Sequence, residues 1–200
     1  MNSISSMTLG IFLLSLAGCS ELQVKRDLKH AQDAEQYIGA LKGDAAGVVA
    51  SDCRITKLGA WNEFSFSATS PVVRLPNGLT ATAFCFTKPA GAKILQIRTY
   101  AAGGMTFHEL TIVHPSILAL DNEFKVVRDL QKPKLSPGEH FIKGLGLTGN
   151  LVLGGELART GYAAFYVHPE SLEGAIDVQT GFESIPIPYG PYGKVEIRFE

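Results

Sequence analysis

The chain lacks net charge, long apolar runs and recognisable catalytic motifs. Its formal net charge is −1, so it has no basic footprint for nucleic acid, and no nucleic-acid partner is expected. Charged residues make up 18% and hydrophobic residues 46%, which indicates a globular protein and excludes a disordered one. The 21 glycines and 10 prolines indicate many turns. No apolar run reaches the roughly 20 residues of a membrane-spanning helix.

One short apolar run, Leu9–Ala17, lies close to the N-terminus and ends in Leu16-Ala17-Gly18-Cys19. No A-x-A triplet, the usual end of a plain secretory signal, precedes the cysteine. The stretch Met1–Thr8 carries no Lys or Arg, which is a departure from the usual basic start of an export signal. The tetrapeptide nevertheless resembles a bacterial lipoprotein signal.

That resemblance implies a signal peptide over residues 1–18 and an acylated Cys19 as the mature N-terminus. The membrane is then a partner through this lipid anchor, and more than one acyl chain gives stable anchoring. In such families an Asp after the cysteine favours the inner membrane. Here Ser20 follows, so we expect the outer membrane, with the protein on its periplasmic face.

With Cys19 acylated, Cys53 and Cys85 are the remaining cysteines. An exported protein meets an oxidising compartment, where the two could form a disulfide. The alternative is two buried, unpaired thiols. The sequence leaves both open, because the geometry of the pair decides.

The stretch Glu21–Lys42 has a helical pattern, and Gly43 is a natural stop. It belongs to a segment, residues 19–48, that we interpret as lipid anchor and helical spacer. An apolar stripe recurs at three- and four-residue steps: Val24, Leu28, Ala31, Ala34, Ile38 and Leu41. The helix either lifts the domain off the membrane and binds a partner, or docks on its own domain through this stripe. The second is favoured because short isolated helices are marginal in water.

Residues 49–200 read as short strands separated by turns, such as Pro76-Asn77-Gly78. The fold class expected is all-β, an antiparallel β-sandwich preceded by one N-terminal helix. Lys194–Phe199 alternates strictly, as a half-buried final strand should, and residues 132–139 are expected to form a loop. The expected strands are Phe64–Thr69, Val72–Leu75, Leu79–Thr87, Lys93–Tyr100, Thr106–Val113, Ile117–Leu120, Phe124–Leu130, His140–Lys143, Asn150–Leu157, Gly161–His168, Gly174–Val178 and Lys194–Phe199.

Gly144–Gly149 matches G-x-G-x-x-G, but that motif binds a dinucleotide only where a strand precedes it and a helix follows. A strand-like segment follows here, so a glycine-rich β-turn is favoured and no cofactor is expected. His108 and His114 would lie about 20 Å apart on one strand, too far for one metal ion. We therefore read them, with His140 and His168, as surface or strand-end residues and expect no metal.

Nucleophile motifs are also missing, since the sequence has no G-x-S-x-G elbow and no C-x-x-C pair. No catalytic residue is assigned and an enzyme is not expected. The aromatic residues suggest a binding surface instead. Tyr189 and Tyr192 lie in the proline-rich stretch Ile185–Gly193, read as a stiff loop, and Trp61 precedes the first strand. Such rings suit a sugar or a protein partner, or they simply cover the end of a sandwich.

The segment His114–Phe124, with an apolar-x-Pro strand, a Leu-Asp turn and an aromatic residue, resembles a hallmark of the maltose operon periplasmic protein family. Phe64-Ser65-Phe66, Ser70-Pro71 and Asn77-Gly78 before Ala81–Phe86 fit its opening strands, and Gly193–Ile197 resembles its final strand. The resemblance covers about residues 60–200. It implies a periplasmic, all-β, non-enzymatic protein linked to carbohydrate uptake.

The expected function is therefore an outer-membrane lipoprotein that acts as a non-catalytic binding or accessory module, with a carbohydrate such as maltodextrin as its ligand. The alternative is a structural or assembly lipoprotein in an envelope protein complex.

Overall fold

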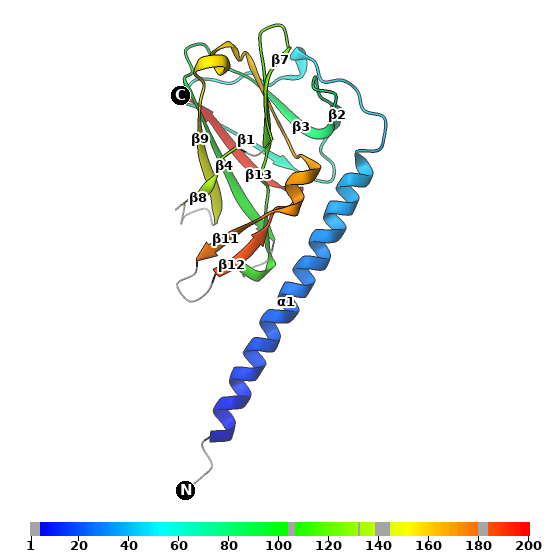
Figure 1. Cartoon of the computed structure of the whole chain (residues 1–200), viewed down its shortest axis with the longest axis vertical. Helices are drawn as coiled ribbons and strands as arrows, with labels where there is room; N and C mark the ends of the chain where they lie inside the picture. Colours follow the sequence, from blue (N-terminus) through cyan, green and yellow to red (C-terminus); the bar gives the residue numbers. More distant parts are fainter. Residues whose placement is uncertain (1–4, 104–106, 132, 139–144, 180–183) are drawn as a thin grey trace.

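A long N-terminal helix precedes a β-sandwich (Figure 1). The computed structural model describes residues 5–103, 107–131, 133–138, 145–179 and 184–200, with the backbone alone for residues 5–20, 107 and 138. The helix, α1, runs from Ser5 to Ala40. The expected fold class, an antiparallel β-protein preceded by one helix, is confirmed.

Two larger sheets and one small hairpin make up the β-domain. The six-stranded sheet has the order β1-β13-β4-β9-β8, with β5 also paired to β4, and the five-stranded sheet has the order β2-β3-β10-β6-β7. The strands of the first are β1 (Trp61–Phe66), β4 (Ile94–Gly103), β5 (Leu110–Ile112), β8 (Ser136–Gly138), β9 (Gly146–Val152) and β13 (Gly193–Phe199); those of the second are β2 (Val72–Arg74), β3 (Thr80–Thr87), β6 (Ser116–Leu120), β7 (Val126–Leu130) and β10 (Tyr162–Tyr166). The hairpin is β11 (Ala175–Gln179) with β12 (Ser184–Pro188), and four short 3-10 helices are η1 (Ala50–Asp52), η2 (Phe107–Glu109), η3 (Gly155–Arg159) and η4 (Pro169–Glu173). Each strand pair is antiparallel.

The main core lies between the two larger sheets. Phe64 of β1 packs against Phe84 and Phe86 of β3, with ring centroids 5.0 Å apart in each case, and against Phe165 of β10 at 5.5 Å. The final strand alternates as its sequence predicts, since its three apolar residues are fully buried in this core. Aromatic rings from three strands therefore join the two layers.

A second apolar cluster covers the outer face of the five-stranded sheet. Leu118, Ala164 and Tyr166 belong to this cluster. The segment leading from α1 to β1 adds Cys53 to it and pairs through isolated bridges with β2 and β3. Tyr166 donates a hydrogen bond of 2.6 Å to Asp129, and Asn77 donates one of 2.9 Å to the other oxygen of the same carboxylate. The segment between α1 and β1 thus continues the pairing of the five-stranded sheet beyond β2 and β3.

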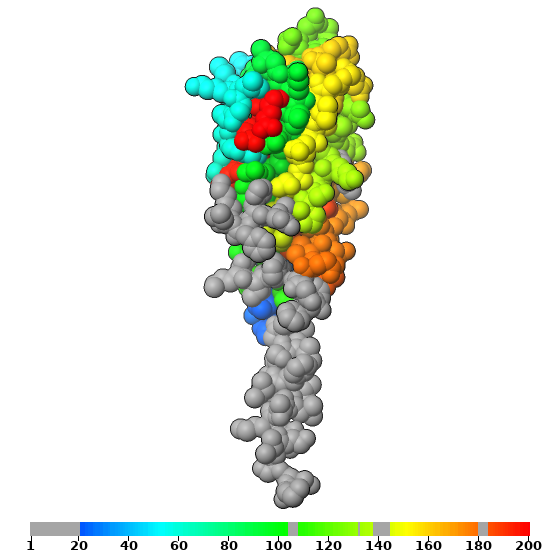
Figure 2. Space-filling view, turned by 90° about the vertical axis from the view of Figure 1, so that its left-hand side faces the viewer, coloured from blue at the N-terminus to red at the C-terminus, as the bar shows by residue number. Residues whose placement is uncertain are grey.

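The outer face of the six-stranded sheet carries polar and charged side chains instead. Figure 2 looks onto this side, where the C-terminal residues in red lie between cyan segments and the green and yellow ones. Lys194 pairs with Glu63 across β13 and β1 at 2.6 Å, and Arg198 pairs with Glu200 at 2.5 Å. The register places Lys194 diagonally across from Glu63, whereas Arg198 and Glu200 are two residues apart along the same segment.

Several predicted boundaries are wrong. The first strand begins at Trp61 and β9 at Gly146, each several residues before the predicted start, and β8 lies inside the expected loop 132–139. The expected strand His140–Lys143 falls outside the described residues. Part of the expected stiff loop Ile185–Gly193 is the strand β12. The prolines Pro186 and Pro188 do not prevent this, because β12 pairs only with β11 and a missing N–H is tolerated in an edge strand.

The glycine motif has a structural explanation. Gly146 and Gly149 lie in β9, and no helix follows them directly, so the context for a pyrophosphate is missing. A Cβ on Gly146 would lie 2.3 Å from the carbonyl oxygen of Thr99 in β4. These glycines allow close approach of strands. The interpretation as a β-turn is also wrong, because the residues extend a strand.

Candidate functional site

The N-terminal helix joins the predicted anchor to the sandwich. Cys19 lies in the N-terminal half of α1, where only the backbone is described, and this half extends beyond the sandwich (Figure 1). Among the described residues, no helix is both long and apolar enough to cross a membrane. The C-terminal half of α1, from Arg26 onward, lies against the domain.

Three side chains of α1 hold it there through main-chain oxygens. Arg26 Nη1 donates to the carbonyl oxygen of Pro186 at 2.9 Å, and the His30 ring Nε2 lies 2.7 Å from that of Tyr189. The ring nitrogen must carry the proton, since a carbonyl can only accept. About two turns further on, the Tyr37 hydroxyl donates to the carbonyl oxygen of Val167 at 2.6 Å. The three residues recur at four- and seven-residue spacing and therefore share one face.

Two of the three docking side chains are buried, which shields their hydrogen bonds from water. Tyr37 is 2% exposed and belongs to the main core, and Arg26 is 7% exposed with its charge paired to Asp27 at 2.8 Å. Burial raises the pKa of the Tyr37 phenol, so it stays protonated as a donor. Of the two alternatives for this helix, the structure has the docked one.

The docked face is not the predicted one. Val24 is 57% exposed, Leu28 60% and Ile38 42%, so these members of the apolar stripe point away from the sandwich. Ala34 and Leu41 do pack against the core. Sequence periodicity failed here because the buried face is formed by Arg26, His30 and Tyr37, whose polar tips reach carbonyl groups while their apolar parts are covered.

A small cavity of about 80 Å³ lies between α1 and the strands β4 and β5. Arg26, Lys29 and Asp33 line it from the helix, and Glu109 and Tyr192 line it from the domain. Lys29 is paired to Asp33 at 2.9 Å. The volume suits a few water molecules rather than a substrate.

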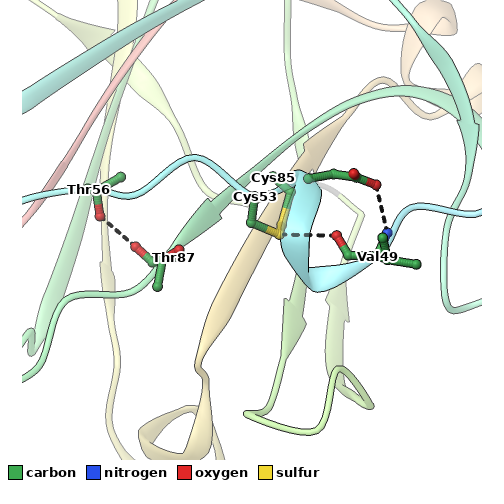
Figure 3. The surroundings of a disulfide bond; sticks show 6 residues. Val49, Cys53, Thr56, Cys85 and Thr87 are labelled. Carbon is green, nitrogen blue, oxygen red and sulfur yellow. Dashed lines mark hydrogen bonds between the residues drawn. A yellow bond between two sulfur atoms is a disulfide. The ribbon is translucent and has the colours of Figure 1, made fainter.

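Cys53 and Cys85 form a disulfide in the structure, with Cα atoms 4.4 Å apart (Figure 3). Of the two alternatives that the sequence leaves open, the bonded one is therefore present. Cys85 lies on the outer face of β3, and Cys53 follows η1 in the segment between α1 and β1. A hydrogen bond from Thr56 to the carbonyl oxygen of Thr87 fastens the same segment. The bond fixes the segment between α1 and β1 to the sheet.

Trp61 lies on the outer face of the six-stranded sheet, within reach of two cations. The guanidinium carbon of Arg98 is 4.0 Å from the ring centroid and that of Arg198 is 4.7 Å away. Both are cation–π contacts. The indole therefore already stacks with protein groups.

The two tyrosines lie at the other end of the sandwich. Trp61 pairs with Arg198, whereas Tyr192 comes just before Gly193, so about 17 Å of strand separates them. Tyr189 packs edge-on against His114 at 5.0 Å and also against Gly174, and Tyr192 lines the cavity beneath α1. Trp61 and the tyrosines do not form a single surface.

The histidines are also dispersed. His168 accepts a hydrogen bond from the backbone N–H of Glu170 and caps η4, and His114 is buried against Tyr189. His108 lies in η2, and His140 is outside the described residues. In the part of the chain that the structure describes, no three His, Cys, Asp or Glu side chains gather where they could hold a metal ion.

Sequence reasoning missed the docking residues His30 and Tyr37, because a polar side chain in a helix usually faces solvent. Their four- and seven-residue spacing with Arg26 was the one signal that could have found them. The chain matches no protein-family model, and comparison with curated proteins and with solved structures found no significant match.

Proposed function

We propose that the chain is an outer-membrane lipoprotein whose β-sandwich faces the periplasm as a non-catalytic binding or accessory module. The observation that carries the proposal is the stretch Leu16-Ala17-Gly18-Cys19, seven residues before the first docked residue, Arg26. Along a helix this separation is about 10 Å. An acyl group on Cys19 would therefore hold the domain close to the membrane surface.

The disulfide supports the compartment. Cys53 and Cys85 are bonded, and structural disulfides persist in oxidising compartments such as the periplasm. This observation is independent of the N-terminal signal. The N-terminal export signal and the disulfide thus support the same compartment.

Lipidation is tested by Cys19→Ala in the native host. We expect the variant to leave the membrane fraction and to lose incorporation of labelled palmitate, and globomycin should block processing of the native chain. Ser20→Ala is the matched control and should stay in the outer membrane. If the Cys19→Ala protein still floats with outer membranes, the anchor is wrong.

The sorting part has its own test. Ser20→Asp should move the protein to the inner membrane, because Asp after the acylated cysteine favours retention there. Separation of the two membranes on a density gradient reads this out. An unchanged position would contradict outer-membrane sorting by Ser20.

A carbohydrate ligand is the refinement that the family resemblance suggests. Maltodextrins should then raise the melting temperature in proportion to ligand concentration, since a ligand that binds only the folded state stabilises it. The same sugar without a shift would remove the link to maltodextrin and leave the anchor proposal intact.

An assembly role is the second candidate, and the outward stripe of α1 favours it. Val24, Leu28 and Ile38 expose apolar surface on one helix beside the predicted membrane anchor. Crosslinking from position 28 in envelope fractions should capture one defined protein if this role holds. Capture from position 28 that persists in a Val24→Glu chain would count against it.

A further inference from the structure

A polar cavity of about 310 Å³ lies at the end of the sandwich opposite the N-terminal half of α1. Three loops form it: the β3–β4 turn, the β6–β7 turn and the segment from η3 to β10. Figure 1 shows η3, the yellow coil, at this end of the molecule. In the proposed orientation the cavity opens away from the membrane.

The wall of the cavity is held by main-chain hydrogen bonds. The N–H of Gly161 donates to the carbonyl oxygen of Leu120 at 2.7 Å, and the N–H of Lys88 donates to the carbonyl oxygen of Gly161 at 2.7 Å. A Cβ on Gly161 would lie 2.2 Å from Oδ1 of Asn122, so the amide sits directly over the glycine. The three loops are thereby fixed relative to one another, and the site is preorganised.

The charge of the lining has one sign. Among the described residues, Lys88 and Arg159 are the ionisable ones that line it, and none of the described carboxylates does. The Lys88 ammonium donates to the carbonyl oxygen of Ala158 at 3.1 Å, which occupies one of its three protons. The neighbouring carboxylate of Glu156 is paired with Arg128. An anion that enters meets two cations, and a guanidinium suits carboxylate and phosphate oxygens especially well.

The rest of the lining offers neutral hydrogen-bonding groups. The exposed amide of Asn122 borders the cavity, and Thr160 lines it with 5% exposure. The Thr160 hydroxyl is fully buried, so it lies behind the wall of the cavity and not in it. Amide and peptide groups are partners that sugar hydroxyls can use.

From these observations we propose that the cavity binds a small acidic sugar, one that carries a carboxylate or a phosphate. The two cations take the anionic group, and Asn122 and the loop backbone take the hydroxyls. The volume lies at the low end of the range for small-molecule sites, which fits one sugar unit. The orientation away from the membrane rests on the proposed function, whereas binding itself does not.

The test is calorimetric titration of the full chain, purified in detergent, with four probes: glucuronate, glucose 6-phosphate, maltose and inorganic phosphate. We expect at least one of the two acidic sugars to bind at least tenfold more tightly than maltose and inorganic phosphate. The stronger of the two identifies the anionic group. Equal binding of maltose, equal binding of inorganic phosphate, or no binding of any probe overturns the proposal.

Variants place the binding in the cavity. Arg159→Gln and Lys88→Gln should each weaken the acidic sugar tenfold or more, and Ala158→Glu should abolish binding by adding an anion. Arg74→Gln and Lys57→Gln, exposed and outside the cavity, are the matched controls and should bind as the native chain does. Unchanged melting temperatures show that the variants are folded. If the double variant Arg159→Gln with Lys88→Gln binds the acidic sugar with native affinity, the proposed site is wrong. The titrations with the native chain and with the variants do not depend on whether Cys19 is acylated.

Discussion

The hydroxyl of Tyr37 donates a hydrogen bond of 2.6 Å to the carbonyl oxygen of Val167, 130 residues further along the chain. This contact ties the end of α1 to the segment between β10 and η4, next to the main core. Tyr37→Phe should lower the free energy of unfolding by about 1–2 kcal/mol, because the buried carbonyl loses its donor. Chemical unfolding in urea measures the loss.

Ile38→Ala is the matched control, since Ile38 lies on the outward face of the same helix. We expect a change within about 0.5 kcal/mol for this exposed position. A larger effect at Ile38 than at Tyr37 would mean that the other face of the helix is docked.

Stability should fall in alkali because of buried tyrosines. Burial raises the pKa of Tyr100 to about 12, with its hydrogen bond to Glu196 adding to the effect, and burial likewise raises the pKa of Tyr37 and Tyr166. The unfolded chain loses these phenolic protons near pH 10, while the folded chain keeps them to higher pH. Their contribution is therefore complete below pH 10 and is lost as the pH rises toward the folded values.

Urea unfolding at a series of pH values, with phenolate absorbance followed in parallel, measures this dependence. Tyr100→Phe should make the decline above pH 10 shallower. A decline of the same steepness in that variant would show that Tyr100 does not contribute.

The disulfide should contribute strongly. It closes a loop of 32 residues between Cys53 and Cys85, for which the chain-entropy relation gives about 3–4 kcal/mol. The double variant Cys53→Ser with Cys85→Ser should lose that amount in urea unfolding. Dithiothreitol should destabilise the native chain similarly and leave the double variant unchanged; a further loss in the variant would point to another target of the reductant.

Gly146→Ala tests the close approach of β9 and β4. The new methyl group would lie 2.3 Å from the carbonyl oxygen of Thr99, so the strands must shift, at a cost of about 1–3 kcal/mol. Gly47→Ala is the control, because a Cβ there meets nothing within 4 Å. Thermal unfolding measures the stability of both variants. Equal melting temperatures for Gly146→Ala and Gly47→Ala would contradict the strand register.

Trp61 offers a fluorescence test of the outer face, since it is the one tryptophan of the chain. Arg98→Ala removes the cation 4.0 Å from its ring and exposes the indole. We expect a red-shifted emission maximum and a loss of about 0.5–1 kcal/mol. Arg74→Ala, on β2 in the other sheet, should change neither quantity.

The sandwich was predictable because its strands carry their own local signals. Alternation from Lys194 to Phe199 and the apolar run over Leu79–Thr87 correspond to β13 and β3 almost residue for residue. The strands β8 and β12 escaped prediction because each contains proline and pairs on a single side. Their existence depends on a partner strand that local sequence does not reveal.

The candidate sites were less predictable because they depend on contacts distant in sequence. A helical stripe shows which residues share a face, but it does not show which face meets the domain. Here the face with Arg26 and Tyr37 is buried, and the face with Val24 and Leu28 is exposed. The cavity beside Arg159 is assembled from three separate loops, so no single motif encodes it. Cys53 and Cys85 could be named as a pair, but their bond required the register of the segment between α1 and β1.

The acceptors beneath α1 are carbonyl oxygens of Val167, Pro186 and Tyr189, which every amino acid possesses. Substitutions at those three positions can keep the acceptors as long as the backbone path is kept. The helix therefore does not read the side chains at these positions, whereas a change of Arg26, His30 or Tyr37 removes a donor. The three acceptor positions can change to any residue that their own surroundings accept without altering how α1 is docked.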